Sequence, residues 1–285
     1  MIDLHFHSTF SDGRFTPEEL ADKVKTIGLK AASLTDHDTT AGSERFKNAL
    51  EGTAVEVISG VELSVEPSDE NSKMTIHMLG YFIDNKNVAL QSALEEVRDG
   101  RESRNKKIIK KLNDLGFDIT YDEVSAYAGE DVVGRLHFAY ALIARKIVGK
   151  KQRAFDNYLG KGKPAYVERF RLTAADSIRL IREAGGVPVL AHPITLGLGY
   201  NQLYDFVSSL KDLGLVGMEI YYSEHKAKHI RDYLRIAKKL DLIATGGSDF
   251  HGEGNDILHL GVGFGNLNVP DSVVDNLKDS IKGLK

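Results

Sequence analysis

Residues 2–13 read Ile-Asp-Leu-His-Phe-His-Ser-Thr-Phe-Ser-Asp-Gly, a short apolar run that carries two histidines at its end. The run has the length and composition of a buried β-strand, and His5 and His7 stand two residues apart in it. Because side chains of a strand alternate between its faces, both imidazoles project to the same side. Two ligands of one metal ion need this arrangement, so the stretch predicts a strand that ends in a metal site.

Further apolar runs of strand length follow along the chain. Together with residues 2–5, we expect strands at residues 31–35, 55–64, 74–82, 187–191, 216–221 and 242–246. Helical periodicity predicts helices at residues 17–28, with Pro17 in the first turn, 173–184, 201–213 and 224–240. Alternating strands and helices favour an α/β fold with a parallel or mostly parallel β/α barrel.

The alternation breaks between residues 84 and 172, where helical runs at 88–115 and 133–148 replace the strands. We therefore expect a barrel over residues 1–83 and 173–285, with an inserted helical cap subdomain over residues 84–172. Positions 90 to 172 hold 17 Lys and Arg residues against 12 Asp and Glu residues, a balance of +5 in a chain of formal charge −4. This asymmetry fits a basic cap over an acidic barrel mouth, and it fits the solvated helix faces of an ordinary helical subdomain equally well.

The overall composition excludes several classes of protein. A chain of 285 residues with 42% hydrophobic residues can bury a sizeable core, which excludes a disordered tail or a small disulfide scaffold. It has no Cys, which excludes disulfides, thiolate metal ligands and a Cys nucleophile, and fits a reducing compartment. We find no signal peptide and no apolar stretch of about 18 residues, so we expect a cytoplasmic protein without membrane association.

Nine side chains that suit a divalent metal ion gather near the predicted strand ends. They are His5, His7, His37, His77, His192 and His251, with the carboxylates Asp12, Glu62 and Asp249. Most lie at or just past the carboxyl end of a predicted strand, where the active sites of β/α barrels form; Glu62 and His77 fall inside their runs. Imidazole and carboxylate ligands without sulfur suit Zn²⁺, Mn²⁺ or Fe²⁺, and one ion uses only about four to six ligands. The set predicts two or three ions that share a bridging carboxylate and attract a phosphate.

Three other histidines, His225, His229 and His259, are expected to have ordinary structural roles. His225 and His229 stand four residues apart on a predicted helix. That spacing can bind a metal, but an exposed helix face explains it equally well.

Some polar residues near the predicted site suit supporting roles. Asp36 and Asp38 flank His37, and we expect them to orient this ligand or the neighbouring loops, with simple turn or capping roles as the alternative. Glu219 ends a predicted strand beside Tyr221 and Tyr222, and we expect it to pack or to support the metal ligands.

These residues, in this order, resemble the polymerase and histidinol phosphatase family, called PHP. The similarity covers residues 2–82 and 187–252 and lies in the motifs Asp3-Leu4-His5-Phe6-His7, Thr35-Asp36-His37-Asp38, Ala191-His192-Pro193 and Ser248-Asp249-Phe250-His251. The resemblance implies a distorted seven-stranded (β/α)7 barrel that commonly holds three metal ions.

The resemblance also implies how the ions share the ligands. One ion would be held by His5, His7, Glu62 and Asp249, a second by Glu62, His77 and His192, and a third by Asp12, His37 and His251. Glu62 would bridge. A metal-bound hydroxide held by Glu62, Asp12, His192 and Asp249 would be the nucleophile, since two ions can lower the pKa of a water molecule towards neutrality.

The predicted cap is similar to that of a bacterial subgroup that includes nucleoside 3′,5′-bisphosphate phosphatases and a 5′-to-3′ RNA exonuclease. The similarity lies in residues 134–139 and 155–166, with Leu136 where members more often have Pro. It implies that Arg135 and His137 bind the substrate phosphate, with Lys163 and Tyr166 nearby, because Arg can bind two phosphate oxygens and Lys supplies a point charge. The alternative is that Arg135 and Lys163 are ordinary surface cations.

The favoured function is removal of the 3′-phosphate of nucleoside 3′,5′-bisphosphates. The alternatives are a 5′-to-3′ exonuclease on short 5′-phosphorylated RNA, a histidinol-phosphate-type phosphatase, a non-catalytic metal-binding interaction module and a non-phosphate hydrolase. The formal charge of −4 argues against tight binding of long nucleic acid, whereas the local charge of the predicted cap allows short strands. We expect two or three Mn²⁺, Zn²⁺ or Fe²⁺ ions as cofactors and no obligate protein partner.

Overall fold

The computed structural model describes residues 1–67, 75–128, 133–168, 170–252 and 258–283, and the chain has an α/β fold. It divides into two units. Unit 1 comprises Met1–Ser92 and Leu172–Lys285, and unit 2 comprises Ala93–Arg171. The predicted boundaries lay at residues 83/84 and 172/173.

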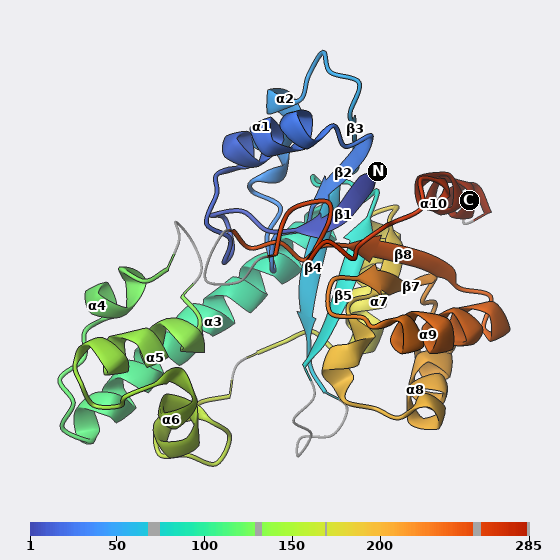
Figure 1. Cartoon of the computed structure of the whole chain (residues 1–285). Coiled ribbons are helices and arrows are strands. Elements are labelled where there is room, and N and C mark those ends of the chain that lie inside the picture. The colour runs from blue at the N-terminus through green and yellow to red at the C-terminus, as the bar shows by residue number, and fades with distance from the viewer. Residues whose placement is uncertain (68–74, 129–132, 169, 253–257, 284–285) are drawn as a thin grey trace. The chain divides into compact units, whose positions relative to one another are not determined.

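The strands of the described residues all lie in unit 1 and form two sheets (Figure 1). The first sheet contains β1 (Ile2–Phe6), β2 (Ala31–Leu34) and β3 (Glu56–Val57), all parallel. The second contains β4 (Gly60–Val65), β5 (Ile76–Tyr81), β6 (Val187–Leu190), β7 (Gly217–Tyr222) and β8 (Ile243–Gly247). In this second sheet β5 runs antiparallel to both β4 and β6, while β6, β7 and β8 are parallel.

Isolated bridges join both edges of the second sheet, β4 and β8, to segments of the first sheet. Phe6 pairs with Phe250 just past β8, and His37 just past β2 pairs with Glu62 of β4, both in parallel fashion. The amide of His7 donates to the carbonyl oxygen of Phe250 at 2.9 Å, and the amide of Asp38 donates to that of Glu62 at 2.9 Å. The carboxyl ends of β1, β2 and β8 and the middle of β4 therefore lie side by side.

The prediction of one strand over residues 55–64 is wrong. The amide of Ile58 still donates to the carbonyl oxygen of Ala32 beside β2, whereas the carbonyl oxygen of Ser59 accepts from Phe82 beside β5. The chain therefore changes its pairing partner at this point, and a Cβ atom on Gly60 would lie 2.3 Å from the Ser33 hydroxyl. An apolar run shows that a segment is buried, but it does not show which strand the segment pairs with.

The reversed direction of β5 departs from the simple alternation of strands and helices. No described helix lies between β4 and β5, and a direct connection between neighbouring strands makes them antiparallel. The predicted strand over residues 74–82 is observed at Ile76–Tyr81, and its first residue, position 74, lies outside the described residues. The remaining pairs are parallel, so the mostly parallel arrangement is found.

Four helices of unit 1 lie within a few residues of their predicted positions. They are α1 (Pro17–Ile27), α7 (Ala174–Glu183), α8 (Tyr200–Asp212) and α9 (Ala227–Lys239). Helix α1 has clear local signals, because Thr16 and Glu19 form a capping box before Pro17, and Gly28 ends the helix at φ 75°. The sequence reading missed α2 (Ser43–Ala49), α10 (Ser272–Gly283) and the short 3₁₀ helix η2 (Pro193–Leu196).

Apolar clusters stabilise unit 1, and two of them lie among its described residues. One joins α1 and α2 to β1 and β2, and it includes Phe6, Leu20, Val24, Phe46 and Phe250. The other joins β1, β5 and β6 to α10, and it includes Ile2, Leu4, Tyr81, Val187, Val189, Val274 and Leu277. Buried apolar area of this kind is the main stabilising contribution to the strands that carry the candidate ligands.

Among the described residues of unit 2, all regular secondary structure is helical. Helix α3 (Val88–Asp114) begins in unit 1 and continues into unit 2, which also contains α4 (Tyr121–Ser125), α5 (Arg135–Ala144), α6 (Lys151–Ala154) and the π-helical turn η1 (Phe155–Leu159). Its core includes Ile108, Leu112, Phe138, Leu142 and Leu159. The helix predicted over residues 133–148 is shorter in the structure, because it starts after Gly134 and ends at Ala144.

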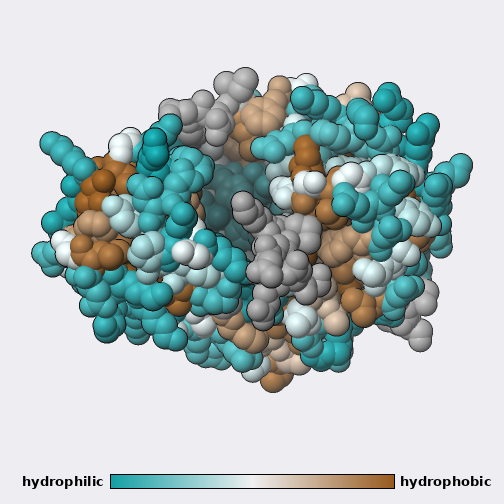
Figure 2. Space-filling model, turned by 90° about the horizontal axis from the view of Figure 1, so that it is seen from below, coloured by the Kyte–Doolittle hydropathy of each residue, from teal (hydrophilic) through white to brown (hydrophobic). Residues whose placement is uncertain are grey.

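The surface in Figure 2 is mostly hydrophilic, with hydrophobic residues in small separate patches. Exposed large hydrophobic side chains occur singly along the sequence, as at Val88, Leu115 and Leu213. Among the described helices, none combines the length and the apolar character that crossing a bilayer requires.

Candidate metal centre

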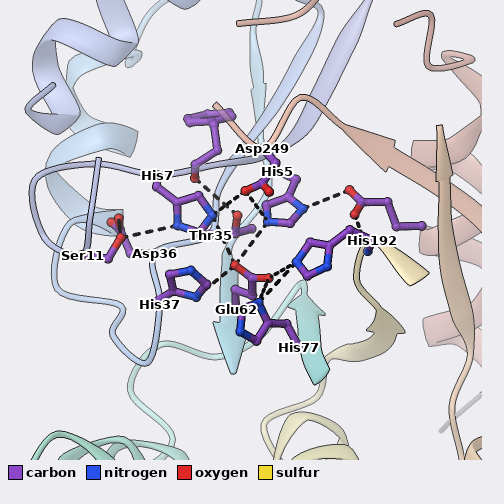
Figure 3. Close-up of polar contacts among 12 residues, drawn as sticks. His5, His7, Ser11, Thr35, Asp36, His37, Glu62, His77, His192 and Asp249 are labelled. Carbon is purple, nitrogen blue, oxygen red and sulfur yellow. Dashed lines mark hydrogen bonds and ion pairs between the residues drawn. The ribbon is translucent and has the colours of Figure 1, made fainter. Parts of the chain in front are cut away.

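Five imidazoles of unit 1 converge on one buried carboxylate, that of Glu62 (Figure 3). Its Oε2 atom lies 3.3 Å from Nε2 of His5, 3.2 Å from Nε2 of His7 and 3.0 Å from Nδ1 of His37. Its Oε1 atom lies 2.9 Å from Nδ1 of His77 and 2.9 Å from Nε2 of His192. Both oxygens of one carboxylate are thus shared among five histidines from four parts of the sequence.

The other two predicted carboxylates border this cluster. Asp249 Oδ1 lies 3.3 Å from Nε2 of His5 and 3.1 Å from Nε2 of His7. Asp12 Oδ1 lies 3.2 Å from Nε2 of His251, and its Oδ2 lies 3.8 Å from Nε2 of His37. The structure therefore brings all nine predicted ligands into one site.

The side chains form three overlapping groups in which the possible ligand atoms lie within 4.8 Å of one another. The groups are His5, His7, Glu62 and Asp249; His37, Glu62 and His77; and His7, Asp12, His37 and His251. The first contains the same residues as the first set implied by the family resemblance. The second contains His37 in place of His192, although His192 contacts the Oε1 atom of Glu62.

The fold explains why ligands from strand interiors and strand ends meet. His7, His37, His192 and Asp249 follow the carboxyl ends of β1, β2, β6 and β8. His77 is the second residue of β5, but β5 runs in the opposite direction, so its start lies beside the carboxyl ends of its neighbours. This reversal explains why His77 fell inside a predicted strand and still reaches the site.

Three polar atoms at the centre of the cluster fit a bound cation. Nε2 of His5, Nδ1 of His37 and Oε2 of Glu62 are buried and have no hydrogen-bond partner among the residues that the structure describes. Buried polar atoms without partners cost free energy and are rare in folded proteins. Imidazole nitrogens and carboxylate oxygens aimed at one point are the donor set that Zn²⁺, Mn²⁺ and Fe²⁺ prefer, so these residues fit divalent ions.

The electrostatics of the cluster favour ionised carboxylates. Burial by itself would raise the pKa of Glu62, but His37, His77 and His5 lower this pKa well below its ordinary value. The pKa of Asp249 is also lowered well below its ordinary value, because His5 and His251 outweigh the effect of burial. At neutral pH these carboxylates carry negative charge into a buried site, where a cation is the natural counter-charge.

The surroundings of the site shift the pKa values of two histidines, His37 and His251, in opposite directions. Burial lowers the pKa of His37 to about 3, so this imidazole is neutral and free to act as a ligand. Burial also opposes the charged form of His251, but Asp12 and Asp249 raise its pKa to about 10. A metal ion that binds His251 must therefore displace a proton.

Two of the candidate ligands hold uncommon backbone conformations. His192 has φ 22° and Asp249 has φ 57°, a region that few residues other than Gly adopt. Hydrogen bonds stabilise both, since the amide of His192 donates to Glu219 Oε2 at 2.7 Å and the amide of Asp249 donates to the carbonyl oxygen of His5 at 2.7 Å. Such strain is typical of functional sites.

Asp36 and Asp38 hold the loops on either side of His37. The carboxylate of Asp36 accepts from the amide and hydroxyl of Ser8, both at 2.7 Å, and from the hydroxyl of Ser11 at 2.6 Å. The carboxylate of Asp38 accepts from the amide and hydroxyl of Ser64 at 2.8 and 2.9 Å. The first aspartate therefore fixes the turn after His7, and the second ties the loop to β4.

The sequence reading assigned no role to two residues that contact this site. Asp3 is fully buried and accepts from the amides of Ser248 and Gly261 at 2.9 and 2.7 Å, which ties β1 to the segment after β8. The hydroxyl of Tyr222 donates to Oδ2 of Asp249 at 3.0 Å. The position of Asp3 inside the first motif is a signal that could have been used, whereas no sequence pattern marks Tyr222.

The four predicted substrate-binding residues, Arg135, His137, Lys163 and Tyr166, lie in unit 2. The guanidinium carbon of Arg135 lies 5.5 Å from the ring centre of Tyr166, and burial lowers the pKa of Arg135. Nδ1 of His137 accepts from the amide of Gly134 at 3.0 Å, so this histidine caps the start of α5. Among the described residues, neither Arg135 nor Lys163 forms an ion pair with a carboxylate, although the charge of Glu168 acts on Arg135.

The other histidines have structural contacts. Nδ1 of His225 donates to the carbonyl oxygen of Ile220 at 2.8 Å, and its buried ring lies 5.0 Å from the rings of Tyr222 and Tyr233. Nδ1 of His229 accepts from the amide of Lys226 at 3.3 Å at the start of α9. His259 takes part in a tight turn with Gly263.

Comparison with known proteins gives a family and several relatives. Residues 3–251 match the PHP domain family. A 3′,5′-nucleoside bisphosphate phosphatase of Chromobacterium violaceum is 31% identical over 89% of this chain and 88% of its own length. A 5′-3′ exoribonuclease of Haemophilus influenzae is 33% identical over 87% of this chain and 89% of its own length.

A third relative and a solved structure extend this picture. A phosphoribosyl 1,2-cyclic phosphate 1,2-diphosphodiesterase of Eggerthella lenta is 29% identical over 91% of this chain and 97% of its own length. A crystal structure from Bifidobacterium adolescentis, named as a metal-dependent phosphoesterase, superimposes with a TM-score of 0.80 and 30% identity over 97% of this chain and 94% of that chain. The names of all four proteins denote action on phosphate esters, and the three sequence relatives are named for different substrates.

Proposed function

This chain belongs to the PHP domain family and is a metal-dependent phosphoesterase, and from that premise we propose that it removes the 3′-phosphate of nucleoside 3′,5′-bisphosphates. The observation that carries the proposal is the convergence of five imidazoles on the two oxygens of buried Glu62. A relative named as a 3′,5′-nucleoside bisphosphate phosphatase, which matches 89% of this chain and 88% of its own length, supports the choice of substrate.

The proposed centre holds two or three divalent ions. His5, His7, Glu62 and Asp249 would hold one, Glu62 with His77 and His192 a second, and Asp12, His37 and His251 a third. When bound, such ions neutralise the charge of the phosphate and lower the pKa of a water molecule that attacks it. The protein's own contribution is to keep Glu62 and Asp249 ionised and His37 neutral, and to fix Asp249 and His192 in strained conformations.

We infer that β1, β2 and β4 to β8 are the seven strands of a distorted barrel. The bridges of Phe6 with Phe250 and of His37 with Glu62 support this interpretation, because they connect both edges of the second sheet to β1 and to the end of β2. The role of unit 2 as a cap stays a prediction, as do the native metal, the cytoplasmic location and the absence of an obligate protein partner.

In the proposed reaction, Arg135 and His137 bind the phosphate that is not cleaved. Arg135 forms no ion pair with a described carboxylate, although the charge of Glu168 acts on it, and its guanidinium carbon lies 5.5 Å from the ring centre of Tyr166. A guanidinium group without a carboxylate partner is available for two oxygens of a phosphate. Lys163 and Tyr166 are proposed to border the same phosphate.

A second candidate function is 5′-to-3′ exonuclease activity on short 5′-phosphorylated RNA. The exoribonuclease from Haemophilus influenzae matches this chain over a similar length and at 33% identity. The excess of basic residues between positions 90 and 172 would attract a short polyanion. The full set of nine ligands argues against a non-catalytic metal-binding module.

The test is Mn²⁺-dependent release of phosphate from adenosine 3′,5′-bisphosphate, with identification of the product. Formation of the 5′-monophosphate, abolished in the Asp249→Asn variant, is the expected result. If metal-loaded protein leaves this substrate intact and instead shortens 5′-phosphorylated oligoribonucleotides, the second function replaces the first. A histidinol phosphate and a 1,2-cyclic ribose phosphate in the same assay distinguish the remaining phosphoesterase activities.

A further inference from the structure

Strand β7 contributes none of the nine candidate ligands, yet two of its side chains contact three of them. We propose that Glu219 and Tyr222 of β7 are positioning residues that set the orientation of His5, His192 and Asp249 for metal binding. This inference rests on the proposed metal centre and adds to it two residues whose task is to hold the ligands in place.

Glu219 fixes the imidazole of His5. Its side chain is fully buried, and its Oε1 atom lies 2.9 Å from Nδ1 of His5. A carboxylate oxygen only accepts, so Nδ1 of His5 carries the hydrogen. The other ring nitrogen, Nε2, lies 3.3 Å from both Oε2 of Glu62 and Oδ1 of Asp249, so it is the nitrogen of His5 that faces the metal centre. Glu219 thereby selects the form of His5 that can bind a metal through Nε2.

The second oxygen of Glu219 fixes His192. Its Oε2 atom accepts from the backbone amide of His192 at 2.7 Å. This amide belongs to the residue with φ 22°, whose conformation needs a stabilising contact. Both oxygens of Glu219 therefore accept a hydrogen, a demand that Gln cannot meet because one end of its amide group is a donor.

Tyr222 fixes the carboxylate of Asp249. Its hydroxyl donates to Oδ2 of Asp249 at 3.0 Å, which leaves Oδ1 directed at His5 and His7. The Tyr222 ring is held between the rings of His192 and His225, with centres 5.6 and 5.0 Å away. The hydroxyl thus acts from a fixed position on a ligand whose own backbone is at φ 57°.

A bulge in β7 allows both side chains to face the centre. Residues 219 and 222 are three apart, so a regular strand would point them to opposite faces. In the pairing of β7 with β8, Glu219 stands opposite Thr245 but Tyr221 stands opposite Gly246, so β7 has one additional residue between them. A Cβ atom on Gly246 would lie 2.3 Å from the carbonyl oxygen of Tyr221, which explains the glycine beside the bulge.

A packing role alone makes a different prediction. Exchange of Glu219 for Gln or Tyr222 for Phe changes the shape of the side chain very little. If these residues only fill space, both variants will bind metal like the unmodified protein. If they orient the ligands, both will bind metal more weakly although the fold is retained.

The experiment compares Zn²⁺ affinity by competition with a chelator, and the visible spectrum of the Co²⁺-loaded protein, for Glu219→Gln and Tyr222→Phe. The matched controls are Glu224→Gln, an exposed carboxylate just after β7, and Tyr221→Phe, the neighbouring tyrosine that packs into the apolar cluster of β1 and α10. We expect affinity to fall by roughly 10- to 100-fold in Glu219→Gln and several-fold in Tyr222→Phe, with altered Co²⁺ spectra, and no change in the controls.

Far-UV circular dichroism verifies the fold of each variant. Unchanged affinity and spectra in both folded test variants would overturn the inference. If Glu219→Gln does not fold, the metal affinity and the Co²⁺ spectrum of Tyr222→Phe alone decide the test. Absence of Zn²⁺ binding in the unmodified protein would instead refute the proposed metal centre, so the two failures are distinguishable.

Discussion

At the scale of single residues, the site depends on carboxylates whose two oxygens have separate tasks. Glu62 contacts three imidazoles through one oxygen and two through the other, and Asp249 faces His5 and His7 through Oδ1 while Oδ2 accepts from Tyr222. Replacement of such a carboxylate by an amide removes the charge and half of the acceptor capacity at nearly constant volume.

The Asp249→Asn variant is therefore expected to lose at least about a hundredfold in turnover, since loss of a ligand costs more than loss of a group that supports one. Phosphate release under saturating Mn²⁺ measures the effect, and the far-UV spectrum verifies that the fold is retained. The matched control is Asp22→Asn, an exposed aspartate of α1 that pairs with Lys25. Near-normal turnover in Asp249→Asn would show that Asp249 is not a metal ligand.

The Arg135→Ala variant tests substrate recognition in unit 2. Loss of a charge-assisted hydrogen-bonding group costs about 1.5–3 kcal/mol, so KM for a bisphosphate should rise roughly 10- to 100-fold with little change in kcat. Steady-state kinetics measure both constants. Arg153→Ala, which removes an exposed cation of α6, is the control and should leave KM unchanged. An unchanged KM in Arg135→Ala would show that Arg135 does not bind the substrate phosphate.

Because of His225, the free energy of unfolding should depend on pH in the acid range. Burial lowers the pKa of this imidazole to about 4, against an ordinary value of about 6.5 in the unfolded chain. Because the unfolded state binds the proton first, the contribution of His225 to stability is complete above pH 6.5 and is lost as the pH falls towards 4. The difference amounts to about 3 kcal/mol.

The His225→Gln variant should therefore lose less stability than the unmodified protein between pH 6.5 and 4. Urea unfolding at a series of pH values measures this difference directly. If the free energy of unfolding falls equally in the two proteins across this pH range, protonation of His225 is not coupled to unfolding.

At the scale of elements, local signals account for the helices better than for the strands. Helix α1 has Thr16 as its N-cap, Glu19 as the partner in the capping box, Pro17 in its first turn and Gly28 after its end, and it was predicted within one residue. Strands β3 and β4 were merged because the apolar run at residues 55–64 continues across the point where the pairing partner changes. Helix α10 was missed, although its apolar face packs against β1 and β6.

The capping box gives a quantitative prediction for α1. Thr16→Ala removes the acceptor of the Glu19 amide and should lower the free energy of unfolding by about 1 kcal/mol. Thr26→Ala on the same helix is the control, because the Thr26 hydroxyl only donates to the carbonyl oxygen of Asp22, which already belongs to the helix. Denaturant titration compares the two, and equal effects would mean that the cap does not limit the stability of α1.

At the scale of the whole molecule, metal binding should be linked to folding, because the ligands come from separate parts of the chain and meet only in the folded state. A ligand that binds the native state alone stabilises it by about 2.7 kcal/mol at a concentration 100 times its dissociation constant. The melting temperature should therefore rise on addition of Mn²⁺ and fall again with excess chelator. Differential scanning calorimetry measures both steps, and His7→Ala should show a much smaller rise.

The amino-acid sequence alone determined the α/β class, the inserted helical region and the identity of the nine residues that meet at the site. These conclusions rest on local properties, namely periodicity, strand ends and the spacing of His5 and His7 or Asp249 and His251. Only the tertiary structure decided that β5 is reversed and so brings His77 to the site, and that a bulge in β7 turns Glu219 and Tyr222 to the same face. Strand direction, pairing register and bulges depend on contacts between segments far apart in sequence, and no single segment contains them.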